Sequence, residues 1–159
     1  MYFTESGRPP LPGSRTIAGY ALAWNVVSAV RPTFDEVFLP GALTWPDNLP
    51  LCLNHQREQP LIRLGPAFRL RADDVGLFAE VDADAINDGE RYLHGARHGG
   101  FRGWSISFIA SKEYWDRSGG HPLRTVERAR LIELSIADRG AHVTTISTLA
   151  KINERRGIT

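Results

Sequence analysis

Short segments of alternating apolar and polar residues, separated by turn-forming residues, make up most of the chain after Arg15. The clearest case is residues 67–83, AFRLRADDVGLFAEVDA, where two alternating segments flank the turn 73–76 and predict a β-hairpin. The same criteria predict further strands, over residues 16–27, 35–43, 49–55, 101–110, 130–137 and 142–150.

One stretch, residues 82–100, favours a helix. Asp84 is expected to cap its start and Gly99 to end it. Gly89 and Gly95 oppose this interpretation, because each costs about 1 kcal/mol relative to alanine inside a helix. Many strands with one or two helices predict an α+β fold, here a mostly antiparallel β-barrel with a few surrounding helices.

Two serines interrupt the apolar segment FRGWSISFIA, residues 101–110. In a strand, side chains alternate between faces, so Ser105 and Ser107 share one face with Ile109. The other face then carries the large apolar residues Trp104, Ile106 and Phe108. The two hydroxyls are either filler or include a nucleophile, and alternation does not choose between them.

An imidazole and a carboxylate lie on or next to other predicted core strands. His55 ends the strand LPLCLNH, where the scaffold would hold it beside a cleft, as a general base requires. Glu133 lies inside RLIELSIA, on the face opposite Ile132, Leu134 and Ile136. The plainer alternatives are a histidine bonded to the backbone, and a glutamate that is solvated or paired with Arg128 or Arg130. Together with a serine, the two residues supply a nucleophile, a base and a group that orients the base.

His94 and His98 offer a different chemistry. Their spacing of four places both imidazoles on one helix face, as a pair of zinc ligands requires. The glutamate of a zinc protease motif is replaced by Gly95, and the only further candidates for a third ligand are His121 and His142. Two solvated histidines on a helix surface are therefore favoured over a metal site.

Composition narrows the class of protein. The 159 residues are 42% hydrophobic and 23% charged, as expected for one globular domain. Because the net charge is only +1, we expect no nucleic-acid partner. Because no apolar run is long enough to span a bilayer, we expect no membrane partner. The single Cys52 excludes an internal disulfide and, with no secretion signal in the sequence, indicates a cytoplasmic protein.

Six phrases of the sequence, in order between Ile17 and Leu149, resemble the prohead (capsid maturation) proteases of tailed bacteriophages. They are GYALAWN, FDEVFLPGAL, LCLNHQREQPLIRLG, DDVGLFAEVDA, FRGWSISF and RLIELSIADRGAH. These serine proteases look distantly related to the herpesvirus assembly proteases, the assemblins, so the resemblance implies an assemblin-like β-barrel surrounded by helices. We accordingly expect a loose arm over residues 1–14, a protease domain over 15–150 and a tail over 151–159.

The resemblance implies that Ser105 is the nucleophile, His55 the general base and Glu133 the acid that orients it, with no cofactor and no metal. It implies a serine endopeptidase that cleaves scaffold and capsid protein inside the assembling procapsid, in the bacterial host cytoplasm. Its partners would be the major capsid protein, with its scaffold segment or a separate scaffold protein, and the protease itself as a substrate. Whether it forms a homo-oligomer is left open.

The sequence departs from the family pattern at two places. Ser107 stands where the family has glycine, and Gly140-Ala141 where it has proline-alanine. The first departure, and a chain that stops soon after the barrel, favour an alternative in which the domain binds capsid protein without cutting it. A zinc hydrolase built on His94 and His98 is the third hypothesis. The oxyanion donors are not assigned beyond backbone N–H groups near Ser105, or Arg128 or Arg130.

Overall fold

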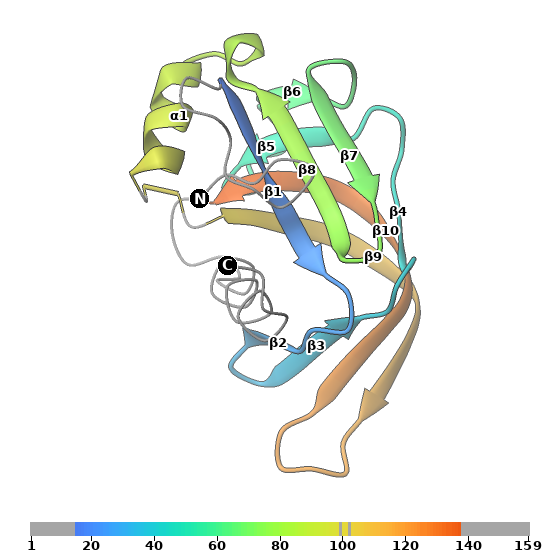
Figure 1. Cartoon of the computed structure of the whole chain (residues 1–159). Helices are drawn as coiled ribbons and strands as arrows, with labels where there is room; N and C mark the ends of the chain where they lie inside the picture. Colours follow the sequence, from blue (N-terminus) through green and yellow to red (C-terminus); the bar gives the residue numbers. More distant parts are fainter. Residues whose placement is uncertain (1–14, 99, 102, 138–159) are drawn as a thin grey trace.

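The computed structural model describes residues 15–98, 100–101 and 103–137 (Figure 1). The arm over 1–14, the strand over 142–150 and the tail over 151–159 lie outside the described residues. The elements are β1 (Thr16–Ala23), β2 (Ser28–Arg31), β3 (Phe34–Phe38), β4 (Leu43–Thr44), β5 (Pro50–Leu53), β6 (Ile62–Arg63), β7 (Phe68–Ala72), β8 (Gly76–Asp82), the 3₁₀ turn η1 (Ala83–Ala85), α1 (Gly89–Arg97), β9 (Gly103–Asp116) and β10 (Leu123–Ala137).

Three antiparallel strands, in the order β1-β8-β7, form the smaller sheet. The predicted hairpin is β7 and β8, and its turn is held by the Asp73 carboxylate, which accepts the backbone N–H groups of Val75 at 2.9 Å and Gly76 at 3.0 Å. β1 pairs with β8 across a bulge between Tyr20 and Leu22, which accounts for the imperfect alternation there.

The larger sheet is built around β10. Its order is β2-β3-β10-β5-β6, and β4 and β9 also pair with β10. β9 runs antiparallel to β10 along nearly its whole length, whereas β3, β4 and β5 follow one another along the opposite edge, all parallel to β10. β10 is therefore the central strand of the larger sheet, and the candidate functional residues lie on it and on its neighbours.

The barrel that the sequence predicts is not observed: in the described residues the two sheets stay separate. β1 pairs with β8 and β9 pairs with β10, but no ladder joins β1 to β9. Side chains make the contact instead, and Trp104 of β9 packs so closely on β1 that a Cβ at Gly19 would lie 3.3 Å from the indole nitrogen. The larger sheet is also mixed, because β3, β4 and β5 run parallel to β10 whereas β9 runs antiparallel to it. The described residues are mostly β with one α-helix, which agrees with the coarser expectation of an α+β fold.

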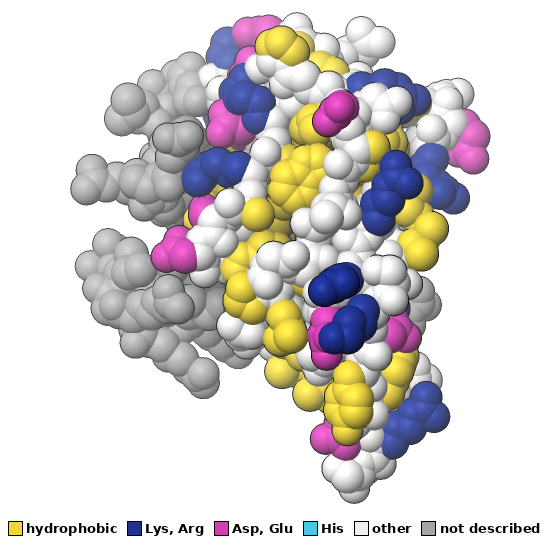
Figure 2. Space-filling view, turned by 90° about the vertical axis from the view of Figure 1, so that its right-hand side faces the viewer, with side chains coloured by type: hydrophobic (Ala, Val, Ile, Leu, Met, Phe, Trp, Pro, Cys, Tyr) yellow, Lys and Arg dark blue, Asp and Glu magenta, His cyan; other side chains and the backbone are white. Residues whose placement is uncertain are grey.

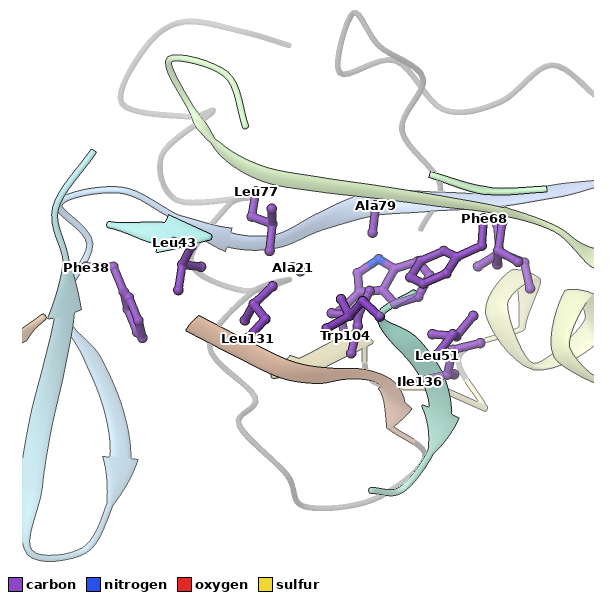
Figure 3. Close-up of a cluster of buried hydrophobic side chains, with 14 of the residues drawn as sticks. Ala21, Phe38, Leu43, Leu51, Phe68, Leu77, Ala79, Trp104, Leu131 and Ile136 are labelled. Carbon is purple, nitrogen blue, oxygen red and sulfur yellow. The ribbon is translucent and has the colours of Figure 1, made fainter. Parts of the chain in front are cut away.

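The core fills the space between the two sheets (Figure 3). β10 contributes Leu131, Leu134 and Ile136, whereas the alternation predicted Ile132 on this face. The cause is a bulge between Leu131 and Glu133, at which β10 advances two residues while β9 advances one. The extra residue turns Leu131 inward and leaves Ile132 outside the core cluster.

The helix is shorter than predicted. It begins at Gly89, directly after Asp88, which has a left-handed backbone conformation. Asp84 is therefore not the cap of the helix; it lies in η1 and forms an ion pair with Arg15. Both unfavourable glycines have a packing reason: a Cβ at Gly89 would lie 1.9 Å from the Ala83 carbonyl oxygen, and one at Gly95 would lie 2.4 Å from the Phe101 ring. The helix ends at Arg97, before the predicted Gly99.

The surface carries both signs of charge in mixture. On the face shown in Figure 2, lysine and arginine side chains alternate with acidic ones around a band of hydrophobic side chains. Neither sign gathers into a large field there, as the net charge of +1 predicts. Within the described ranges, no helix combines the length and apolarity needed to cross a bilayer.

Candidate functional site

Three neighbouring strands bring the polar residues of the site into one row. In register, Ser135 of β10 lies between Cys52 of β5 and Ser105 of β9. Directly paired residues point to the same face of a sheet, so these three side chains share one face. Glu133, two residues back on β10, lies on that face opposite Ser107.

The other face of the same strands is the hydrophobic core. Leu134 of β10 is paired with Leu51 of β5 on one side and with Ile106 of β9 on the other. Two residues further along β10, Ile136 is paired with Trp104. The predicted division of 101–110 into an aromatic face and a serine face is therefore observed for residues 104–108. Packing of the apolar face fixes the strand register, and the register fixes the distances between the polar groups.

His55 is placed by a sharp change of direction at the end of β5. The Asn54 N–H still bonds the Ile136 carbonyl at 3.1 Å, which extends the ladder one residue beyond the strand. Asn54 and His55 then both adopt left-handed backbone conformations, with φ of 47° and 64°. Such conformations cost a non-glycine residue of order 1–3 kcal/mol and persist only where surrounding contacts hold them. They turn the imidazole back over the polar face.

The imidazole lies between a hydroxyl and a carboxylate. Ser105 Oγ is 3.0 Å from His55 Nε2, and His55 Nδ1 bonds Glu133 Oε1. Since the carboxylate can only accept, Nδ1 carries a proton, and in the neutral ring Nε2 is then the acceptor for the Ser105 hydroxyl. The structure thus brings together all three residues that the sequence nominated. A histidine bonded mainly to backbone is not what it shows.

Glu133 is fully buried, with 0% of its surface exposed. Its second oxygen, Oε2, accepts the Ser135 hydroxyl at 2.5 Å. The alternatives of a solvated glutamate and of an arginine pair are wrong: Arg128 and Arg130 lie further along the strands, opposite Lys112 and Ile109. In the described part of the chain, the ion pair of Glu133 is with His55.

Ser107 approaches the other nitrogen of the ring. Its Oγ is 3.3 Å from His55 Nδ1, the atom that bonds Glu133. A proton leaving the Ser107 hydroxyl would need a vacant lone pair on Nδ1, and that nitrogen already bears a proton. The geometry therefore distinguishes the two serines, since only Ser105 faces the basic nitrogen.

Cys52 is a neutral member of this buried row. Burial, and next the adjacent Glu133 carboxylate, raise the pKa of its thiol to about 11. The thiol is therefore protonated at neutral pH and is not a thiolate nucleophile.

Access to the site is narrow. Ser105 is 2% exposed, whereas the side chain of His55 is 33% exposed. Ser105 is therefore almost fully covered, and the more exposed His55 ring is the part of the pair that reaches the surface.

His94 lies in α1 and His98 directly follows the end of the helix, and within the described residues no third metal-binding side chain joins them. The His94 and His98 rings lie 4.4 Å apart, His121 instead pairs with Asp35, and His142 lies outside the described residues. Among residues that the structure describes, no three histidine, cysteine or acidic side chains form a group able to hold a metal ion.

Two residues of the site were missed by sequence reasoning. Cys52 and Ser135 are single small residues in mainly apolar segments, and no pattern in those segments singles either of them out. Their proximity arises from the pairing of β5 with β10, a parallel register that no local pattern reports. The one signal in the sequence was the position of Ser135, two residues after the candidate Glu133 and so on the same face of a strand.

Comparisons with known proteins give one match. The family model described as caudovirus prohead serine protease matches residues 9–156 of this chain, nearly its whole length. Neither the curated proteins nor the solved structures give a match.

Proposed function

Because the chain belongs to the family of caudovirus prohead serine proteases, whose members mature phage capsids, we propose that it is a serine endopeptidase acting through Ser105, His55 and Glu133. Its substrates would be the major capsid protein, its scaffold segment or a separate scaffold protein, and copies of the protease itself. The reaction would take place inside the assembling procapsid, in the host cell.

One observation carries the proposal: a single imidazole bonds a serine hydroxyl through Nε2 and a buried carboxylate through Nδ1. As Ser105 Oγ attacks the peptide carbonyl, its proton passes to His55 Nε2. Glu133 keeps the Nδ1 proton in place and stabilises the imidazolium that forms. The Nε2 proton then passes to the leaving amine, so that the C–N bond breaks and an acyl-enzyme remains.

Water completes the cycle by the same groups. His55 Nε2 takes a proton from the water that attacks the acyl-enzyme, and returns it to Ser105 Oγ as the ester bond breaks. Each proton is accounted for on Nε2, and no cofactor enters the reaction.

Co-expression tests this function. With the cognate capsid and scaffold proteins, the wild-type chain is expected to shorten them, as followed by intact-mass spectrometry. Ser105→Ala is expected to abolish processing, and Ser107→Ala to retain it, because Ser107 faces the protonated nitrogen. Processing that survives in the Ser105→Ala variant would disprove the assignment of the nucleophile.

The near-complete burial of Ser105 favours the second candidate, a domain that binds capsid protein without cutting it. The same experiment separates the two functions. If the wild-type chain co-purifies with assembled capsid protein of unchanged mass, binding without cleavage is the function.

A further inference from the structure

Ser135 contacts both partners of the proposed acid–base pair. Its Oγ lies 2.5 Å from Glu133 Oε2 and 3.0 Å from the backbone nitrogen of His55. The residue is 0% exposed, so no solvent competes for either bond. None of the roles assigned above includes it.

The direction of both hydrogen bonds is fixed by the chemistry of the groups. A serine hydroxyl has one proton and two lone pairs. The Ser135 hydroxyl donates its hydrogen bond to the Glu133 carboxylate. The His55 N–H can only donate, so its hydrogen bond is accepted by a lone pair of Ser135 Oγ. Both bonds require one rotamer of Ser135, which ties the carboxylate and the histidine backbone to one atom.

Each bond restrains a feature that the proposed chemistry needs. The bond to Oε2 stops the carboxylate from rotating about its last C–C bond, and so holds Oε1 on His55 Nδ1. The bond to the His55 amide holds a residue with φ of 64°, a conformation that a non-glycine residue leaves readily unless restrained. The imidazole and the carboxylate therefore keep a fixed relative position.

We propose that Ser135 is a positioning residue of this site, which aligns Glu133 and His55 so that Nε2 can accept the Ser105 proton. The inference rests on the proposed function, and it goes beyond it by adding a fourth residue that does not touch the substrate. Ser135 acts through the two groups that it bonds, so its loss would reduce the reactivity of Ser105 without removing the nucleophile.

The test compares Ser135→Ala, which removes the hydroxyl, with Ser135→Thr, which keeps it. The matched control is Ser111→Ala on the same β9–β10 pair, where the exposed hydroxyl bonds the Arg128 carbonyl at 3.3 Å, away from His55 and Glu133. The first readout is the rate at which a fluorophosphonate labels the folded protein. The second is the proton NMR resonance of His55 Nδ1–H in ¹⁵N-histidine-labelled protein, which reports the His55–Glu133 bond itself.

In Ser135→Ala we expect labelling to slow by roughly ten- to hundredfold. The Nδ1 proton resonance should move upfield or disappear through exchange. Ser135→Thr should label at least about fivefold faster than Ser135→Ala and keep the resonance, and Ser111→Ala should match wild type. The proposal is overturned if Ser135→Ala labels within about twofold of wild type with its resonance unchanged, or if both Ser135 variants slow equally.

A measurement on the wild-type protein keeps the proposal testable if Ser135→Ala does not fold. The His55 amide should be protected from hydrogen exchange, because Ser135 Oγ accepts its proton. Rapid exchange of that amide would overturn the proposal. Failure of the proposed function would look different, because wild type would then fail to label or Ser105→Ala would label equally fast.

Discussion

At the scale of single residues, the burial of Glu133 determines what must surround it. A carboxylate removed from water costs several kcal/mol unless its oxygens are paired. Here one oxygen bonds the His55 ring and the other bonds Ser135. The site is therefore a closed set of mutual bonds, in which the loss of any member leaves a buried group without its partner.

Glu133→Gln tests the charge of that residue while keeping its shape. The glutamine amide can present its NH₂ group to Nδ1, which favours the tautomer with a proton on Nε2 and so removes the base from Ser105. We expect the rate of fluorophosphonate labelling to fall by about 10³–10⁴-fold, with the protein still folded by circular dichroism. Glu127→Gln, which disrupts a surface ion pair with Lys112, is the control and should label normally. A Glu133→Gln rate within about tenfold of wild type would contradict the role of the carboxylate.

Sequence reasoning nominated the three residues that the structure brings together, and their roles stay a prediction. His55 could be nominated because it ends a core strand. Alternation could only show that Ser105 and Ser107 share a face and that Glu133 lies opposite the apolar residues of its strand. The resemblance to the prohead proteases supplied the three roles. Alternation does not report which residues lie opposite one another on two strands. The contact of Ser135 with His55 depends on strand register and on a left-handed turn, so only the structure supplied it. The resemblance to the prohead proteases had already chosen Ser105 over Ser107, and the structure adds that Ser105 faces Nε2 whereas Ser107 faces Nδ1.

At the scale of elements, close backbone contacts decide where the helix begins. Gly89 is the first residue of α1, and its Cα lies against the carbonyl of Ala83 in η1. The sequence pattern treated this glycine as a weakness of a longer helix. In the fold it marks the boundary, since no side chain fits between η1 and α1.

Gly89→Ala should therefore destabilise the protein, although alanine favours a helix over glycine by about 1 kcal/mol. A Cβ 1.9 Å from a backbone oxygen forces the two elements apart, and we expect a loss of about 1–3 kcal/mol in the free energy of unfolding. Urea denaturation measures this change. Gly120→Ala is the matched control, with no atom within 4 Å of its Cβ, and should stay within about 0.5 kcal/mol of wild type. Equal stability of the two variants would refute the packing explanation.

At the scale of the whole molecule, the two sheets are joined by side chains and not by a hydrogen-bonded ladder. Trp104 lies in the core between them, next to Ser105 on the same strand (Figure 3). Neither the closed barrel nor the assemblin-like fold is confirmed in the described residues. Local patterns identify strands but not their partners. Strands as short as β4 and β6, with two residues each, carry too little pattern to reveal a parallel pairing or an unclosed edge.

Trp104→Ala should weaken this junction. We expect the free energy of unfolding to fall by about 3–5 kcal/mol, because the indole is buried and its removal leaves a cavity between the sheets. Tyr114→Ala, on the exposed part of the same strand, is the control and should change stability by about 0.5 kcal/mol or less. Chemical denaturation of both variants measures the difference. A loss below about 1 kcal/mol for Trp104→Ala would show that other contacts hold the sheets together.

The central claim is that His55 activates Ser105, and the most direct measurement is the identity of the residue that a fluorophosphonate modifies. Peptide mapping of the treated wild-type protein by mass spectrometry should locate the adduct on Ser105, and His55→Ala should not form it. An adduct on Ser107 or another residue, labelling that persists in His55→Ala, or a wild-type chain that forms no adduct would contradict the claim.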